Sequence, residues 1–127
     1  MTYAARARSL VGCRFRPQGR TPKYGLDCLG LAAIAYEIPG EQVPADYRLH
    51  GPNLPILLDG LKQYFRTVAA SRATSGDLLL FDAGRNQVHL AVKTDVGFVH
   101  ADTRLGVVET PGDSPWPILR TLRRRAR

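Results

Sequence analysis

The stretch Tyr24-Gly25-Leu26-Asp27-Cys28-Leu29-Gly30-Leu31-Ala32-Ala33-Ile34-Ala35-Tyr36 decides the fold of this chain, because it is typical of a turn that runs into a buried helix. Asp27 is a favourable N-cap residue, since its carboxylate can accept hydrogen bonds from the free N–H groups of the first turn. Apolar side chains then occur on every side, and a helix of that kind is normally buried. The sequence predicts a helix over residues 27–38, ended by Pro39-Gly40, with the Cys28 thiol at its N-terminus.

The position of Cys28 favours a reactive thiol. The partial positive charge at a helix N-terminus stabilises a thiolate and lowers the pKa of the thiol. The carboxylate of Asp27 acts in the opposite direction, so a reactive Cys28 needs a further cationic partner. The alternative is a small core cysteine that only packs, since most buried free cysteines behave in that way.

The composition is that of one globular domain, residues 1–127. The chain is 44% hydrophobic and 23% charged, which is ordinary for a globular protein in water. No apolar run is long enough to span a membrane, so we expect no membrane partner. Residues 1–8 lack the apolar core of a secretory signal, which predicts cytoplasmic synthesis without a signal peptide. The two cysteines, Cys13 and Cys28, do not form a disulfide framework.

Positive charge is concentrated at the C-terminal end. The net charge is +7, and the sequence predicts a basic tail from about residue 120, containing Arg120, Arg123, Arg124, Arg125 and Arg127. Such a tail favours an anionic partner, such as a cell-wall polymer or an acidic protein face, or is simply solvated. Zinc-finger and RNP signatures are missing, so we expect no specific nucleic-acid partner.

The periodicity of apolar residues divides the chain into helices first and strands after. Helices are predicted over 3–11, 27–38 and 54–65, with an irregular, proline-marked connection over 39–55. Strands are predicted over 77–81, 87–93 and 98–101, from 107, and over 118–122. This order indicates an α+β fold in which N-terminal helices pack on an antiparallel β-sheet meander.

Two histidines lie on neighbouring predicted strands. A two-residue turn at Thr94-Asp95 would place His89 directly opposite His100, on one face and close enough for a hydrogen bond. If the Cys28 helix packs on that face, the thiol meets His89, and His100 orients His89, which is the logic of a catalytic triad. The alternatives are unrelated surface imidazoles, or a zinc site formed by the same three side chains. Metal-binding spacings such as CxxC or HExxH are missing from the sequence, so we expect no metal and no cofactor.

Four segments, in order, resemble the NlpC family of cell-wall cysteine peptidases, which are compact papain-like enzymes. With Φ for an apolar residue, the family's first element, Gly-Φ-Asp-Cys-Ser-Gly-Φ, is matched by Gly25-Leu26-Asp27-Cys28-Leu29-Gly30-Leu31, and its second, Gly-Asp-Leu-Φ-Φ-Phe, by Gly76-Asp77-Leu78-Leu79-Leu80-Phe81. The third, His-Val-Gly-Ile, is matched by His89-Leu90-Ala91-Val92, and the fourth, Φ-His-Ala, by Val99-His100-Ala101. Order and spacing agree over about residues 12–108.

The resemblance implies a function. Cys28 would attack a peptide carbonyl, His89 would serve as general base and then acid, and His100 would orient His89. The implied substrate is the peptidoglycan stem peptide, cut at its γ-linked D-glutamyl bond, with no metal or cofactor. By analogy with phage-like particles, the chain would be a tail-associated peptidase that acts in the periplasm during delivery, with tail proteins as partners. The alternatives are a catalytically weak structural or binding component of such a tail, and an amidase or acyltransferase that uses the same triad.

The sequence departs from the family pattern at two places. Leu29 replaces the serine after the cysteine, a change that a packing side chain tolerates. Phe15 stands where a tyrosine often contributes its hydroxyl to the oxyanion site. The Cys28 backbone N–H and the Gln18 amide are the remaining candidate donors, and Tyr24 and Asp27 are candidate residues of the cleft. An exposed loop glutamine is the alternative for Gln18, and core packing is the alternative for Tyr24.

Overall fold

The computed structural model describes residues 1–43, 54–85 and 87–126. Part of the predicted connection over 39–55 lies outside the described residues. Within these described residues, three α-helices and eight strands, with two short 3-10 turns, follow one another in the order α1 (Tyr3–Arg8), β1 (Arg20–Thr21), β2 (Gly25–Leu26), α2 (Cys28–Ala35), η1 (Gly40–Gln42), α3 (Leu54–Leu61), β3 (Phe65–Val68), η2 (Ala70–Arg72), β4 (Leu78–Asp82), β5 (Val88–Lys93), β6 (Gly97–Asp102), β7 (Gly106–Pro111) and β8 (Ile118–Arg124).

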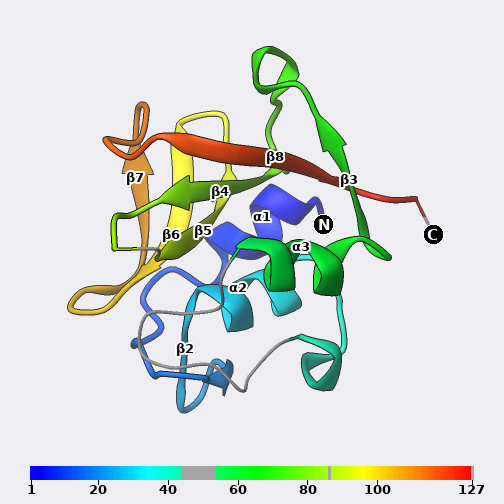
Figure 1. Ribbon diagram of the computed structural model, residues 1–127. Helices are drawn as coiled ribbons and strands as arrows, with labels where there is room; N and C mark the ends of the chain where they lie inside the picture. The colour runs from blue at the N-terminus through cyan, green and yellow to red at the C-terminus, as the bar shows by residue number, and fades with distance from the viewer. Residues whose placement is uncertain (44–53, 86, 127) are drawn as a thin grey trace.

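The predicted meander is the middle of a larger sheet. Strands β4 to β7 pair with their sequence neighbours, and β8 returns to pair with β4 on one side and β3 on the other, giving the order β3-β8-β4-β5-β6-β7. All pairings in this sheet are antiparallel. Figure 1 shows α2 and α3 below the sheet, with β4 and β8 crossing above them. The α+β class with N-terminal helices on an antiparallel sheet is confirmed.

Strand β3 was not predicted. The sequence analysis placed Phe65 at the end of a helix over 54–65, but α3 ends at Leu61 and Phe65 begins β3. Phe65 is buried, and its ring packs edge-on against Tyr36 with a centroid distance of 4.9 Å. Phe65 is therefore buried in the core, as its spacing predicts, but it belongs to a strand and not to the predicted helix.

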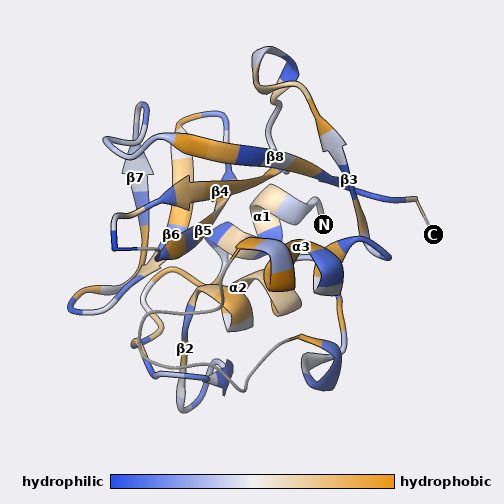
Figure 2. Ribbon diagram, viewed as in Figure 1, coloured by the Kyte–Doolittle hydropathy of each residue, from blue (hydrophilic) through white to orange (hydrophobic). Residues whose placement is uncertain are grey.

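Helix α2 has the predicted N-terminus. Asp27 is the N-cap, and its side chain accepts a hydrogen bond from the Gly30 N–H at 2.8 Å. Most of the helix is buried, as its apolar residues on every side predict. Its end at Ala35 comes earlier than predicted, because Glu37 adopts a left-handed φ of 56°, which an α-helix cannot continue through. Figure 2 shows α2 and β4 coloured mainly as hydrophobic.

The two faces of the sheet carry different apolar clusters. Side chains of β5 on the helix face, Val88, Leu90 and Val92, pack in the main core with residues of α2. The other face carries a smaller cluster formed by Leu79, Phe81, Ala91 and Phe98, with Trp116 packed against it. Helix α2 therefore covers the face of β5 from which His89 points away, which differs from the predicted arrangement.

The turn between β5 and β6 lies one residue later than predicted. Thr94 N–H donates to Gly97 O at 2.9 Å, so Asp95 and Val96 are the central residues. The Thr94 hydroxyl oxygen accepts from the N–H groups of Val96 (3.2 Å) and Gly97 (3.0 Å), which explains why the turn forms here.

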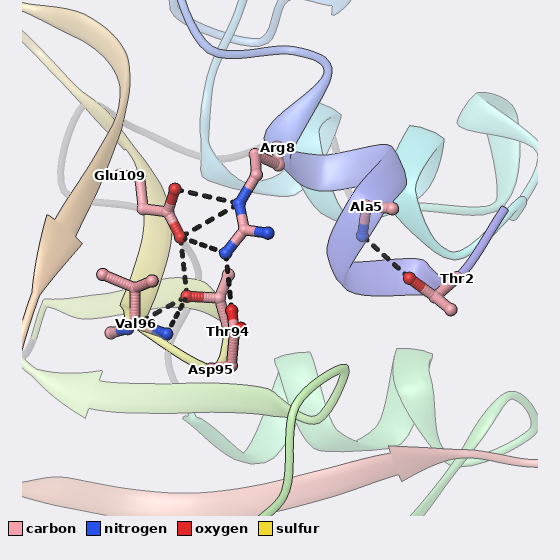
Figure 3. A network of polar contacts seen from close by, with 8 residues as sticks. Thr2, Ala5, Arg8, Thr94, Asp95, Val96 and Glu109 are labelled. Carbon is pink, nitrogen blue, oxygen red and sulfur yellow. Dashed lines mark hydrogen bonds and ion pairs between the residues drawn. The ribbon is translucent and has the colours of Figure 1, made fainter.

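Helix α1 supports this turn through an ionic network. The Thr94 hydroxyl donates to Glu109 on β7, and Arg8 donates to both Glu109 and Asp95 (Figure 3). The distances from Arg8 Nη2 to the two carboxylates are 2.7 Å each. Residues distant in the sequence thus determine the register of the histidine hairpin.

The arginine-rich end is largely part of the sheet rather than a tail. Strand β8 includes Arg120, Arg123 and Arg124, which the sequence analysis assigned to the basic tail. Arg123 forms a two-pronged ion pair with buried Asp77, and Arg124 donates to Tyr36 O at 3.1 Å. Strand pairing and these contacts account for the difference.

Within the described residues, no helix has both the length and the apolar composition that a membrane span requires.

Candidate active site

The two histidines share the sheet face opposite α2 and contact each other. His89 of β5 is paired with Phe81 of β4, and His100 of β6 is paired with Ala91 of β5. Because Ala91 lies two residues after His89, the two imidazoles are diagonal neighbours rather than directly opposed. The predicted register is wrong by two residues because the turn lies one residue later. A two-residue shift keeps every side chain on its face, and only an odd shift would have separated the histidines. The predicted hydrogen bond is confirmed, with 2.8 Å between His89 Nε2 and His100 Nδ1.

A third side chain continues this relay. His100 Nε2 lies 3.2 Å from the hydroxyl oxygen of Thr110 on β7. When Nε2–H of His89 donates to His100 Nδ1, Nε2–H of His100 donates to Thr110, and Nδ1 of His89 keeps a lone pair to accept a proton. This chain of contacts holds the ring orientation of His89, and in this tautomer His89 can act as a base through Nδ1.

Cys28 lies where β5 separates from β6. Strand β5 pairs with β4 from Val88 to Val92, but the paired residues toward β6 start only at Ala91. The Leu90 backbone N–H interacts with the Cys28 sulfur and lowers its pKa. The thiol therefore lies beside the strand residue that directly follows His89, and it reaches the strand from the helix face.

Both reacting groups are neutral at neutral pH. Desolvation, and next the charge of Asp27, raise the pKa of the Cys28 thiol to about 11, while backbone N–H groups of Leu90, Cys28 and Leu29 oppose this rise. Desolvation, and next the nearby His100, lower the pKa of His89 to about 4, although Asp102 opposes this fall. The expected thiolate at the helix N-terminus is therefore not the resting state, because exclusion of water outweighs the helix dipole.

The remaining predicted site residues lie around the start of α2. Asp27 is buried, and its carboxylate accepts from the Gln18 backbone N–H at 2.9 Å. Gln18 is exposed and has a left-handed φ of 58°. Tyr24 is 57% exposed, with the Lys23 ammonium 5.5 Å from its ring centroid, so it does not pack in the core. Phe15 packs against the main core and forms an isolated bridge with Leu26.

Trp116, which the sequence analysis did not select, covers the imidazoles. Its ring centroid lies 5.1 Å from that of His89 and 6.1 Å from that of His100. As the single tryptophan of the chain, in a proline-rich connection before β8, it could have been noted, but no sequence spacing links it to β5. Thr110 was missed for the same reason, since its role depends on the pairing of β6 with β7.

We predict that Trp116→Ala raises the pKa of His89 from about 4 toward its ordinary value of 6.5. The reason is that desolvation is the largest cause of the low value, and removing the indole admits water. The measurement is an NMR titration of the imidazole signals, assigned with His89→Gln. Val96→Ala, which shortens an exposed apolar side chain in another turn, serves as control and should leave the His89 titration in place.

The same shift makes folding sensitive to acid. The unfolded chain takes up a proton on His89 near pH 6.5, but the folded chain does so only near pH 4. Stability is therefore complete above pH 6.5 and falls as the pH is lowered through this window. In Trp116→Ala the pH range over which stability falls should become narrower. A His89 titration that is unchanged in this variant would contradict the assigned role of the indole.

In the part of the chain that the structure describes, no three His, Cys, Asp or Glu side chains are grouped in a way that could hold a metal ion. Cys13 and Cys28 are both free thiols.

Sequence comparison extends the resemblance over nearly the whole chain. The profile of the NlpC/P60 family matches residues 12–123. The chain is 31% identical over 106 residues to a curated relative from Escherichia coli, "Murein DD-endopeptidase MepS/Murein LD-carboxypeptidase", in strain K12 and again in strain O157:H7. The alignment covers 83% of this chain and 50% of the relative, so the chain spans about half the length of these curated relatives.

Solved structures support the fold. A lipoprotein-like protein of the NLP/P60 family from Staphylococcus aureus superimposes with a TM-score of 0.62 at 20% identity, over 96% of this chain and 40% of the other. The peptidoglycan hydrolase RipB from Mycobacterium tuberculosis gives the same TM-score and identity, over 96% of this chain and 62% of the other. With the profile match across residues 12–123, these comparisons show that the chain belongs to the NlpC/P60 family.

Proposed function

We propose that this protein is a cysteine peptidase that hydrolyses peptide bonds in peptidoglycan, with Cys28 as nucleophile, His89 as general base and acid, and His100 as the residue that orients His89. Two contacts along β5 support the proposal. The Cys28 thiol contacts the backbone of β5 one residue after His89, and His89 is hydrogen-bonded to His100. Membership of a family whose relatives include peptidoglycan hydrolases supports the substrate class.

The neutral resting state determines how the first step proceeds. Nδ1 of His89 accepts the thiol proton as the sulfur attacks the carbonyl carbon, so the proton moves together with formation of the carbon–sulfur bond. The imidazolium then gives this proton to the leaving amine, and a thioester remains. Water attacks the thioester with His89 again as base, which releases the carboxylic acid and restores the thiol.

The oxyanion formed in each half of the reaction needs hydrogen-bond donors. The Cys28 backbone N–H lies at the first position of α2, where a helix has no preceding turn whose carbonyl oxygen could accept from it. We propose it as the principal donor and the Gln18 amide as the second. Phe15 cannot donate a hydrogen bond to the oxyanion. Compared with a site that has a tyrosine at this position, the loss of one oxyanion donor would lower the rate about 100–1,000-fold.

The test is hydrolysis of purified peptidoglycan fragments by the wild-type protein and by Cys28→Ala, with Cys13→Ala as the matched thiol control. We expect stem-peptide products from wild type and Cys13→Ala, and loss of activity to background in Cys28→Ala. Product release at the wild-type rate by Cys28→Ala would refute the proposed nucleophile.

Mass spectrometry of the products identifies the bond. The family resemblance favours the γ-linked D-glutamyl bond, which leaves a dipeptide on the glycan-bound end of the stem. The name of the Escherichia coli relative instead describes cleavage of DD-crosslinks and LD-bonds. Fragments that keep the γ-linkage and lose only crosslinks would contradict our choice.

A second candidate is a structural or binding component of a phage-like tail in which the chemistry is weak. The observation that favours it is Phe15, whose ring packs against the core and offers no hydroxyl. A protein that binds wall fragments in a pull-down assay, but hydrolyses them no faster than Cys28→Ala, would support this candidate. Detection of the chain in purified particles by mass spectrometry would test the proposed tail association and periplasmic action.

A further inference from the structure

The buried carboxylate next to the nucleophile holds three elements together. Asp27 accepts from the Gly30 N–H of α2 (2.8 Å), from the Gln18 N–H of the preceding loop (2.9 Å) and from Arg20 Nη1 of β1 (2.8 Å). The side chains of Asp27 and Arg20 are only 5% and 18% exposed. An ion pair of this burial interacts more strongly than a surface pair, because water screens it less.

Close packing of the loop on the helix brings Arg20 to this position. A Cβ at Gly30 would overlap the carbonyl oxygen of Gly19, so only glycine allows the loop to lie directly on the first turn of α2. Arg20 Nη1 also donates to that Gly19 carbonyl at 2.9 Å. The guanidinium is thus fixed against both the loop backbone and the N-cap carboxylate.

Asp27 opposes ionisation of Cys28, and the imidazoles do not compensate for it. Asp27 is the charged side chain that acts on the thiol, and Arg20 from β1 is paired with Asp27. On β5, His89 directly precedes Leu90, whose N–H interacts with the sulfur, and the partner of His89 on β6 is His100. The two histidines are neutral at neutral pH, because burial lowers the pKa of both. Arg20 is therefore the cation that balances the carboxylate beside the nucleophile.

We propose that Arg20 is a positioning residue for Cys28: its guanidinium neutralises and holds the Asp27 carboxylate, which limits the opposition of that charge to loss of the thiol proton and keeps the start of α2 against β5. The inference rests on the proposed role of Cys28 as nucleophile. It assigns Arg20 an electrostatic effect on Cys28 that opposes the effect of Asp27, and this predicts that removing both charges together largely restores the reactivity of the thiol.

The experiment measures alkylation of Cys28 by iodoacetamide at pH 8, with peptide mass spectrometry resolving Cys28 from Cys13. Cys13 reacts in the same tube and is the internal control. Variants are Arg20→Met, Arg20→Lys, Asp27→Asn and the double variant, with Arg66→Met as a control that removes an exposed arginine of β3. Asparagine remains a good N-cap, so Asp27→Asn removes charge but keeps the cap.

We expect Arg20→Met to slow alkylation of Cys28 about tenfold, which corresponds to a rise of one pKa unit, because the reactive species is the thiolate. Arg20→Lys, which keeps the charge, should stay within about threefold of wild type, as should the double variant. Asp27→Asn alone should speed alkylation of Cys28, because it removes the negative charge that raises the pKa of the thiol, so the double variant combines two opposite effects. Alkylation of Cys13 should not change in any variant.

No slowing by Arg20→Met, or a double variant that reacts as slowly as Arg20→Met alone, would overturn the proposal. If Arg20→Met alone fails to fold, the double variant decides, and a tenfold loss of Cys28 reactivity in it would overturn the electrostatic role. Alkylation does not depend on hydrolysis. Failure of the Cys28→Ala test on wall fragments would reject the peptidase activity, whereas failure of the charge coupling would reject only the role of Arg20.

Discussion

Replacing His89 by alanine is expected to lower peptidoglycan hydrolysis by about 10²–10⁴-fold, the range typical of losing a general acid–base group. The loss should exceed that of a residue that only shapes the cleft, because the resting thiol has a pKa of about 11 and needs a base to take its proton. A preformed thiolate would depend on the base only for later steps. The measurement is the initial rate of stem-peptide release at pH 7.5.

The control for His89→Ala is Lys93→Ala, a truncation on the same face of β5, four residues along the strand. It should retain activity within about twofold, since surface truncations rarely disturb a distant site. Fluorescence of Trp116 and near-UV circular dichroism check that both variants fold. A folded His89→Ala protein with more than a tenth of the wild-type rate would show that another group takes the thiol proton.

Asp77→Ala removes a buried carboxylate that forms an ion pair, and we expect it to lower the free energy of unfolding by about 2–3 kcal/mol. Asp77 is 2% exposed and accepts from both Arg123 Nε and Arg123 Nη2 at 2.9 Å, and from the Thr74 N–H at 2.9 Å. Alanine would leave the Thr74 N–H without its acceptor and remove the carboxylate that holds Arg123 of β8. Urea denaturation measures the change.

Asp59→Ala is the matched control for Asp77→Ala. Asp59 also pairs with a cation, Lys62 at 2.9 Å, but both side chains are 74% exposed. Its loss should change the free energy of unfolding by no more than about 0.5 kcal/mol, because water screens an exposed i,i+3 pair. Equal losses in the two variants would mean that the burial of Asp77 does not determine its contribution.

The two predictions concern separate parts of the molecule. Asp77 connects the start of β4 to β8 and so stabilises the sheet that carries the histidines, whereas His89 acts at the opposite end of the β4–β5 pairing. Asp77→Ala should therefore lower the unfolding midpoint while the folded fraction keeps its hydrolytic rate. His89→Ala should show the reverse pattern.

The sequence by itself determined the local features on which the site depends. The N-cap at Asp27, the thiol at the first residue of α2 and the burial of that helix follow from capping and from apolar residues on all sides. The alternation of β5 and β6 placed both histidines on one face, and this conclusion survived a wrong register, because the register shift was even.

Only the tertiary structure decided the features that depend on contacts between distant residues. The hydroxyl of Thr94, supported by Arg8 and Glu109, moved the hairpin turn by one residue. Pairing with β3 and β4 extended the predicted strand over 118–122 to Arg124, into residues that were expected to belong to a basic tail. Exclusion of water around Cys28 and His89 made both groups neutral. Local patterns record which residues are buried or capped, but register, strand partners and desolvation arise from packing between segments that the order of residues does not place together.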